Sequence, residues 1–163
     1  MTPIRMSSLF ATVVLLAGCG AMGQHHPKTQ GAYGPHGMVS VKSPHSQAET
    51  VSRLETQVRQ RNLNITARID HAAAAQRIGQ TLLANEVVIF GNPQAGTPLM
   101  QCAPTVGIDL PMKALVWTDA NGQVWLGYND PAWLMHRHGA PECPAAKNVS
   151  NALAAIAEAT VAR

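Results

Sequence analysis

The sequence predicts a single α+β domain, in which helices and strands are interleaved without the strict alternation of a parallel α/β protein. Three observations lead to this class. Apolar residues recur at helical spacing in 47–61 and 147–161, towards the two ends of the domain. Strand patterns lie between these helices. The last two, 114–118 and 123–128, flank Asn121-Gly122, a pair typical of antiparallel hairpins. The predicted order is β-α-β-α-β-α-β-β-α.

The first strand and the first helix are predicted from adjoining patterns. Residues 38–42 alternate apolar and polar side chains, which indicates a short strand. Ser46 and Glu49 fit a capping box, in which each side chain bonds the backbone of the other residue at a helix start. The helix that follows, 47–61, has one apolar stripe, made of Val51, Leu54 and Val58.

Two further strands and a short helix are predicted in the middle of the chain. Residues 65–69 read as a strand, and Asp70 can cap an alanine-rich helix that ends near Gly79. Residues 87–90 are apolar at every position, which predicts a central strand buried on both faces. Gly91-Asn92-Pro93 ends this strand.

The remaining helices are predicted with less regular patterns. Residues 98–106 indicate a short helix with an apolar side that includes Met100, Ala103 and Val106. A further helical turn is predicted for 131–136.

The first residues predict export and attachment to a bacterial membrane. Arg5 precedes the apolar run 9–17, which is too short to cross a bilayer and is typical of a signal peptide. The run ends in Leu16-Ala17-Gly18-Cys19, which resembles the lipobox of bacterial lipoproteins, so Cys19 is expected to carry the lipid anchor. The alternative is an ordinary signal peptide with an incidental cysteine. Gly20 in place of aspartate favours the outer membrane over the inner one.

These features divide the chain into a signal peptide (1–18), a flexible tether (19–37) and a periplasm-facing domain (38–163). The net charge of +3 falls by one when Arg5 leaves. So small an excess does not indicate a nucleic-acid partner, and none is expected for an exported protein. Cys102 and Cys143 remain in an oxidising compartment. They are either free or joined by a disulfide, which the sequence leaves open.

Four spaced motifs resemble one known family, the domain of unknown function 302. They are Phe90-Gly91-Asn92-Pro93, Pro98-Leu99-Met100-Gln101, Asp109-Leu110-Pro111 and Tyr128-Asn129-Asp130-Pro131. The resemblance covers about residues 48–140. It implies a curved antiparallel sheet with helices packed on it, of the TATA-binding-protein-like type, and no activity. Some members have a cysteine directly before the Asn-Pro pair, where this chain has Gly91, so thiol or metal chemistry is not expected there.

The candidate ligand-binding residues are Asn92, Gln101, Tyr128 and Asn129. If the strands that end near residues 90 and 128 finish at the same edge of the sheet, these side chains could line one pocket. In the simpler interpretation, Asn92 bonds its own turn, and Asn129 or Asp130 caps the helix that follows. No known catalytic motif is present, and no catalytic residue is assigned.

Seven histidines raise the question of a copper or zinc site. Four of them are expected in or near the tether: His25, His26, His36 and His45. His136 and His138 are weak candidates, because residues two apart share a face on a strand but point in nearly opposite directions on a helix. The positive charge of Arg137 between them also disfavours a metal cation. We therefore expect at most weak metal binding, through the tether.

The sequence favours a non-catalytic module that binds a small ligand or a protein. The alternatives are a periplasmic metal-handling protein and an enzyme of unknown substrate. The cofactor, if any, stays unknown.

Overall fold

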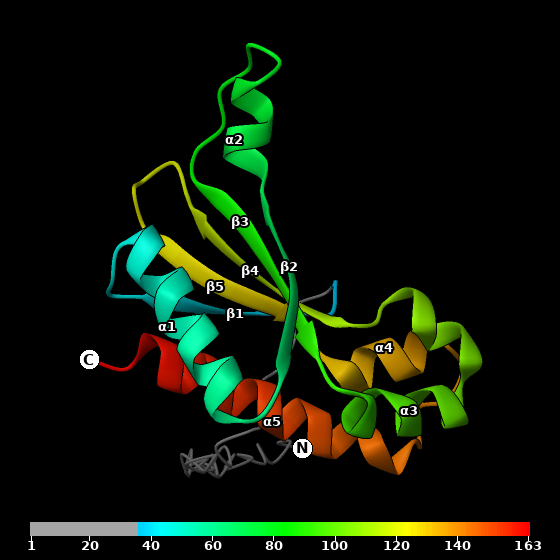
Figure 1. The fold of residues 1–163 in the computed structure, drawn as a ribbon. Coiled ribbons are helices and arrows are strands. Elements are labelled where there is room, and N and C mark those ends of the chain that lie inside the picture. The colour runs from blue at the N-terminus through cyan, green and yellow to red at the C-terminus, as the bar shows by residue number, and fades with distance from the viewer. Residues whose placement is uncertain (1–35) are drawn as a thin grey trace, which may run out of the picture.

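Figure 1 shows a computed structural model that describes residues 36–163. The predicted signal peptide, Cys19 and nearly all of the predicted tether lie outside the described residues. The domain contains one five-stranded sheet in the order β1-β5-β4-β3-β2, and every neighbouring pair is antiparallel. The strands are β1 (Met38–Ser43), β2 (Asn64–Asp70), β3 (Asn85–Gly91), β4 (Met112–Thr118) and β5 (Val124–Asn129). The predicted α+β class is confirmed.

The helices lie between the strands in the chain. They are α1 (Gln47–Gln60), α2 (His71–Gln76), α3 (Pro93–Cys102), the 3-10 helix η1 (Pro104–Ile108), α4 (Pro131–Arg137) and α5 (Pro144–Val161). Helices α1 and α5 pack against each other and on the same face of the sheet. In Figure 1, α2 projects beyond one end of the sheet, whereas α3 and α4 lie at the opposite end. No helix of residues 36–163 has the length and apolar character needed to cross a bilayer.

The core lies between the sheet and the pair α1–α5. Strand β3 contributes Val88 and Phe90, which are 0% and 1% exposed. The neighbouring Val87 and Ile89 point to the other face and are only half-buried. The prediction that this strand is buried on both faces was therefore wrong. Two side chains of the apolar run lie in the core and two lie on the less covered face, because successive side chains of a strand alternate between faces.

The opposite face carries a pair of stacked indoles. Trp117 of β4 and Trp125 of β5 lie directly across from each other, with ring centroids 6.1 Å apart and planes inclined by 12°. The amino group of Lys42 lies 5.4 Å from the centre of the Trp125 ring. The Trp125 indole donates to Asp119 over 2.8 Å, and this bond is the main cause that lowers the pKa of the Asp119 carboxyl. These aromatic residues therefore brace the β4–β5 hairpin.

Helix α3 differs from the prediction. It begins at Pro93, directly after Asn92, and ends at Cys102, whereas the predicted helix ran from 98 to 106. Pro98 was taken as a first helical residue, but Pro93 fills that position, where a missing N–H costs nothing. Residues 104–108 form the separate 3-10 helix η1.

The domain begins slightly earlier than expected. Gly37, assigned to the tether, is buried, and its carbonyl accepts a 2.9 Å hydrogen bond from the backbone N–H of Asp130. Its φ of +77° and the Trp133 ring against its α-carbon leave no room for a side chain. Gly37 therefore belongs to the folded domain, whereas the tether before it stays a prediction.

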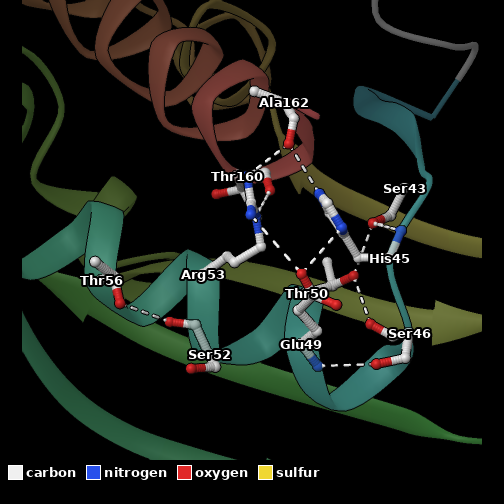
Figure 2. A network of polar contacts seen from close by, with 10 residues as sticks. All are labelled: Ser43, His45, Ser46, Glu49, Thr50, Ser52, Arg53, Thr56, Thr160 and Ala162. Atoms are coloured by element: carbon white, nitrogen blue, oxygen red, sulfur yellow. Dashed lines mark hydrogen bonds and ion pairs between the residues drawn. The ribbon is translucent and has the colours of Figure 1, made fainter.

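His45, expected in or near the tether, lies inside a polar network that joins the start of α1 to the end of α5 (Figure 2). Its ring contacts Glu49 at 3.1 Å and the carbonyl of Ala162 at 2.8 Å. Arg53 donates to the carbonyls of Thr160 and Ala162 over 2.8 and 2.5 Å. A cation at a helix C-terminus stabilises carbonyl groups that lack helical partners. The network therefore fastens the last helix to the first.

Candidate functional site

A cavity of about 450 Å³ lies at the end of the sheet from which α3 departs. Asn64 and Thr66 of β2 form one side of it. Helix α3 contributes residues from Pro93 to Met100, and the segment from Gly107 to Met112 closes the opposite side. No charged side chain lines this cavity.

A second cavity, of about 230 Å³, lies between α3, the end of β3 and α5. Its wall includes core residues such as Phe90, Leu153 and Ile156. The two cavities share four lining residues: Gly91, Ala95, Met112 and Val149. Together they border the first turns of α3 on two sides.

Asn92 lines the larger cavity, as predicted, but its side chain is already bonded to the protein. Its Oδ1 accepts from the backbone N–H of Ala95 over 2.8 Å and so caps α3. Its Nδ2 donates to the carbonyl of Asn62 over 3.4 Å. The simpler interpretation of Asn92 therefore holds, and its role in the cavity wall is to position α3.

The other predicted ligand residues do not join Asn92. Strands β3 and β5 do end at the same end of the sheet, since both run antiparallel to β4. Tyr128 nevertheless points into the core and is 6% exposed, whereas Asn129 and Gln101 are exposed. None of these three residues lines either cavity. The expected convergence fails because β4 separates the two strand ends and neighbouring strand residues face opposite ways.

Tyr128 and Asp130 have structural surroundings. Burial, with a smaller contribution from the nearby Asp130 carboxylate, raises the pKa of Tyr128 to about 12. Asp130 is 8% exposed and caps α4, accepting from the N–H groups of Ala132 and Trp133 over 2.6 and 3.3 Å. The Ser150 hydroxyl donates to the same carboxylate oxygen over 3.4 Å, which links α4 to α5.

His136 and His138 are not arranged as a pair of metal ligands. His136 is exposed, whereas both ring nitrogens of His138 already have partners. One nitrogen lies 2.6 Å from Oδ2 of Asp109 and the other 2.9 Å from the Thr105 hydroxyl. Within residues 36–163, no three histidine, cysteine or acidic side chains are grouped to hold a metal ion. Metal binding through the tether stays a prediction.

Thr105, His138 and Asp109 are residue types that occur together in hydrolase active sites. Arg137 adds an ion pair to Asp109 at 3.3 Å. None of these residues lines either cavity, and the contacts join η1 to the end of α4. We interpret the group as a structural connection that holds the far wall of the larger cavity.

The structure joins Cys102 and Cys143 in a disulfide, with their Cα atoms 5.9 Å apart. This separation is typical of protein disulfides. The bond connects the last residue of α3 to the residue before α5. It therefore links the two helices that border the second cavity.

Sequence reasoning missed most of the cavity wall, although its signal was present. Thr66, Gly96, Leu99 and Leu110 carry no chemistry that marks a site by itself. Three of the four motifs that resemble the family nevertheless contribute to the larger cavity, with Gly91-Asn92-Pro93, Leu99-Met100 and Leu110-Pro111. The spacing of those motifs was the available indication.

The chain is similar to parts of several curated proteins. It is 40% identical over 150 residues to fluoride-specific ion channel FluC 1 of Brucella suis biovar 1 (strain 1330). This match covers 85% of this chain and 59% of that protein. The match to FluC 1 of Brucella abortus biovar 1 (strain 9-941) is also 40% identical and covers 85% of this chain and 56% of that protein. The chain thus spans little more than half the length of these relatives.

A solved structure shares the fold. It is the crystal structure of an uncharacterized conserved protein DUF302 from Bacillus stearothermophilus, with a TM-score of 0.71 and 22% sequence identity. The match covers 76% of this chain and 98% of that chain. The family model described as domain of unknown function DUF302 matches residues 39–160, which is nearly the whole described domain. The chain therefore belongs to the DUF302 family, as its motifs had indicated.

Proposed function

We propose that this protein is a non-catalytic binding module that takes a small, mainly apolar molecule into the cavity beside α3. The observation that carries the proposal is the wall of that cavity. Leu99, Met100, Leu110 and Met112 contribute apolar surface, and no charged side chain lines it. Its volume of about 450 Å³ lies within the range of about 300–1,000 Å³ that small-molecule sites occupy.

The polar groups of the wall support the same class of ligand. Asn64, Thr66 and Thr97 are exposed and lie at the cavity's solvent side, where a polar part of a ligand could bond them. Asn92 is occupied as the cap of α3. A buried charge on the ligand would have no counter-ion here and would lose hydration without compensation. A neutral or weakly polar body therefore suits the interior.

We further propose that the module is held at the periplasmic side of a bacterial membrane, the outer one, by the lipid predicted on Cys19. The signal-peptide pattern and the lipobox-like residues support this location. A ligand that is mainly apolar is scarce in water and abundant near a membrane. An anchored position would therefore keep the cavity close to its supply.

The test compares the natural chain with a cavity-filling variant and a matched control. A Cβ at Gly96 would lie 3.6 Å from Cδ1 of Leu110, an ordinary contact, so Gly96→Leu should fill the larger cavity without breaking α3. Gln101→Leu adds the same side chain to an exposed position of the same helix, outside both cavities. Each protein is purified from the envelope of its own host and extracted with organic solvent for mass spectrometry.

The natural chain and Gln101→Leu should each retain a compound, in roughly equal molar amount to the protein. Gly96→Leu should retain none. Circular dichroism and thermal melting confirm that all three are folded. An identical extract from all three folded proteins, or no retained compound in the natural chain, would refute the proposed function.

A second candidate follows from the curated relatives. We propose that the domain can also act beside a fluoride channel, because proteins bearing that name match most of this chain and contain a further part that it does not match. Deletion of the gene should then increase the sensitivity of the host to fluoride, and the natural gene should restore growth. Unchanged fluoride tolerance in the deletion strain would remove this candidate.

A further inference from the structure

We propose that the ligand is an amphiphile with a single unbranched hydrocarbon chain, which enters the larger cavity, passes beneath the first turns of α3 and ends in the smaller cavity. This inference rests on the proposed function and specifies its ligand. The polar head of the amphiphile stays at the mouth of the larger cavity, and the end of its hydrocarbon chain reaches the side of α5.

The arrangement of the two cavities points to one elongated site. Gly91, Ala95, Met112 and Val149 line both of them, so the two spaces adjoin at these residues. Two of these residues are glycine and alanine, which leave little bulk between the sheet and α3. Met112 is unbranched at every carbon, and methionine adapts to irregular space more readily than other core residues. Its movement would join the cavities.

The chemistry of the walls changes along this path. The exposed polar residues Asn64, Thr66 and Thr97 border the larger cavity. The smaller cavity ends against the core, at Phe90, Leu153 and Ile156, and no charged side chain lines it. Its polar lining residues, Gln94 and Asn148, are exposed. One end of the combined site can therefore bond a polar head, whereas the part of the smaller cavity against Phe90, Leu153 and Ile156 offers apolar contacts and suits a methyl terminus.

The shape predicts how affinity depends on chain length. Each additional buried methylene should strengthen binding by up to about fourfold until the smaller cavity is filled. A compound that fits in the larger cavity alone gains nothing from the second. A ligand with bulky rings or two adjacent hydrocarbon chains is not expected to bind, since the proposed site holds one chain that runs from one cavity to the other.

The experiment uses the anchored protein in its own envelope. Cells are supplied with octanoic acid or hexadecanoic acid that carries a diazirine at the terminal carbon, and the labelled peptides are mapped after illumination. The long probe should label α5 near Leu153 and Ile156, and the short probe should label only residues of the larger cavity, such as Met100 and Leu110. The mass of each adduct identifies the head group as a free carboxylate or a lysophospholipid. Either single-chain form supports the proposal.

A variant with a blocked passage provides the control. Ala95→Phe should move the long-probe label from α5 to the larger cavity, whereas Gln101→Phe, on the exposed side of α3, should leave it on α5. If the long probe labels only the larger cavity of the natural chain, the single elongated site is wrong while the proposed function stands. If neither probe labels either cavity, the inference about the hydrocarbon chain fails, and the extraction experiment decides the proposed function separately. An adduct with a two-chain lipid, or one that joins α5 to Cys19 of the same chain, would also overturn the inference.

Discussion

Removal of the bond between Cys102 and Cys143 should destabilise the domain by about 4 kcal/mol. The two residues are 41 positions apart, and a cross-link of that span removes chain entropy from the unfolded state. In the chain-entropy model the closed loop of this length stabilises the fold by about 4 kcal/mol. With a slope of about 2 kcal/mol per molar urea, the unfolding midpoint should fall by about 2 M.

The assay follows urea unfolding by tryptophan fluorescence in a variant that carries Cys102→Ser and Cys143→Ala. Serine suits position 102 because Cys102 is exposed, and alanine suits position 143 because Cys143 is 7% exposed and packs in the core. The natural chain under reducing conditions serves as the control. It loses the cross-link but keeps the sulfur atoms, so agreement between the two measurements assigns the loss to the cross-link.

Two results would refute this reasoning. The first is alkylation of both cysteines in the purified protein without prior reduction, detected by mass spectrometry, because it would show that both thiols are free. A loss of stability below about 1 kcal/mol in both the variant and the reduced protein would show that the unfolded chain is not restricted by the bond.

Four other predictions follow from single side chains. Because burial raises the pKa of Tyr128 to about 12, its phenol stabilises the fold below pH ~10, and this contribution is lost as pH rises through about 12. Between those limits the natural chain should lose about 2 kcal/mol more than Tyr128→Phe in urea unfolding; parallel pH curves would contradict this. Asn92→Ala should cost about 1 kcal/mol by removing the cap of α3, and Asn92→Asp should restore it; an equal loss in both would count against a capping role. Arg53→Met, which keeps the apolar stem but not the bonds to α5, should cost about 1 kcal/mol by thermal melting, and a change near zero would mean that the network in Figure 2 is neutral. Cys19→Ser should release the protein from the membrane fraction or stall its processing; unchanged partition and mature mass would exclude the anchor.

Local patterns predicted the elements well where one physical signal dominated. The apolar stripe that ends at Val58 placed α1 within one residue, and Asp70 caps α2 as expected, accepting from the N–H of Ala73 over 2.8 Å. The Asn121-Gly122 turn joins β4 to β5, with Gly122 at a φ of +80°. Each of these signals acts between residues that are close in the chain, so no tertiary information was needed.

The errors arose where two signals competed or where the environment was not local. Two prolines could each begin α3, and the Asn92 cap directly before Pro93 places that residue, not Pro98, at the first helical position. The four apolar residues 87–90 were predicted to be buried on both faces, but the sequence of a strand does not show whether other elements cover the second face of the sheet. Gly37 was assigned to the tether because its contact is not local: the ring of Trp133, nearly a hundred residues later in the chain, packs against it.

Periodicity, turn chemistry and the lipobox-like residues can be recognised within short stretches of sequence, so they were enough to predict the class of the fold, the family and the location of the protein, of which the location stays a prediction. The cavity, in contrast, could be recognised only in the folded chain. Asn92, Gln101, Tyr128 and Asn129 were grouped by their chemistry, yet the strand pleat sends Tyr128 into the core and β4 separates it from Asn92. The cavity is formed instead by side chains with little chemistry of their own, and their apolar walls become a site only when β2, β3, α3 and the segment before β4 come together.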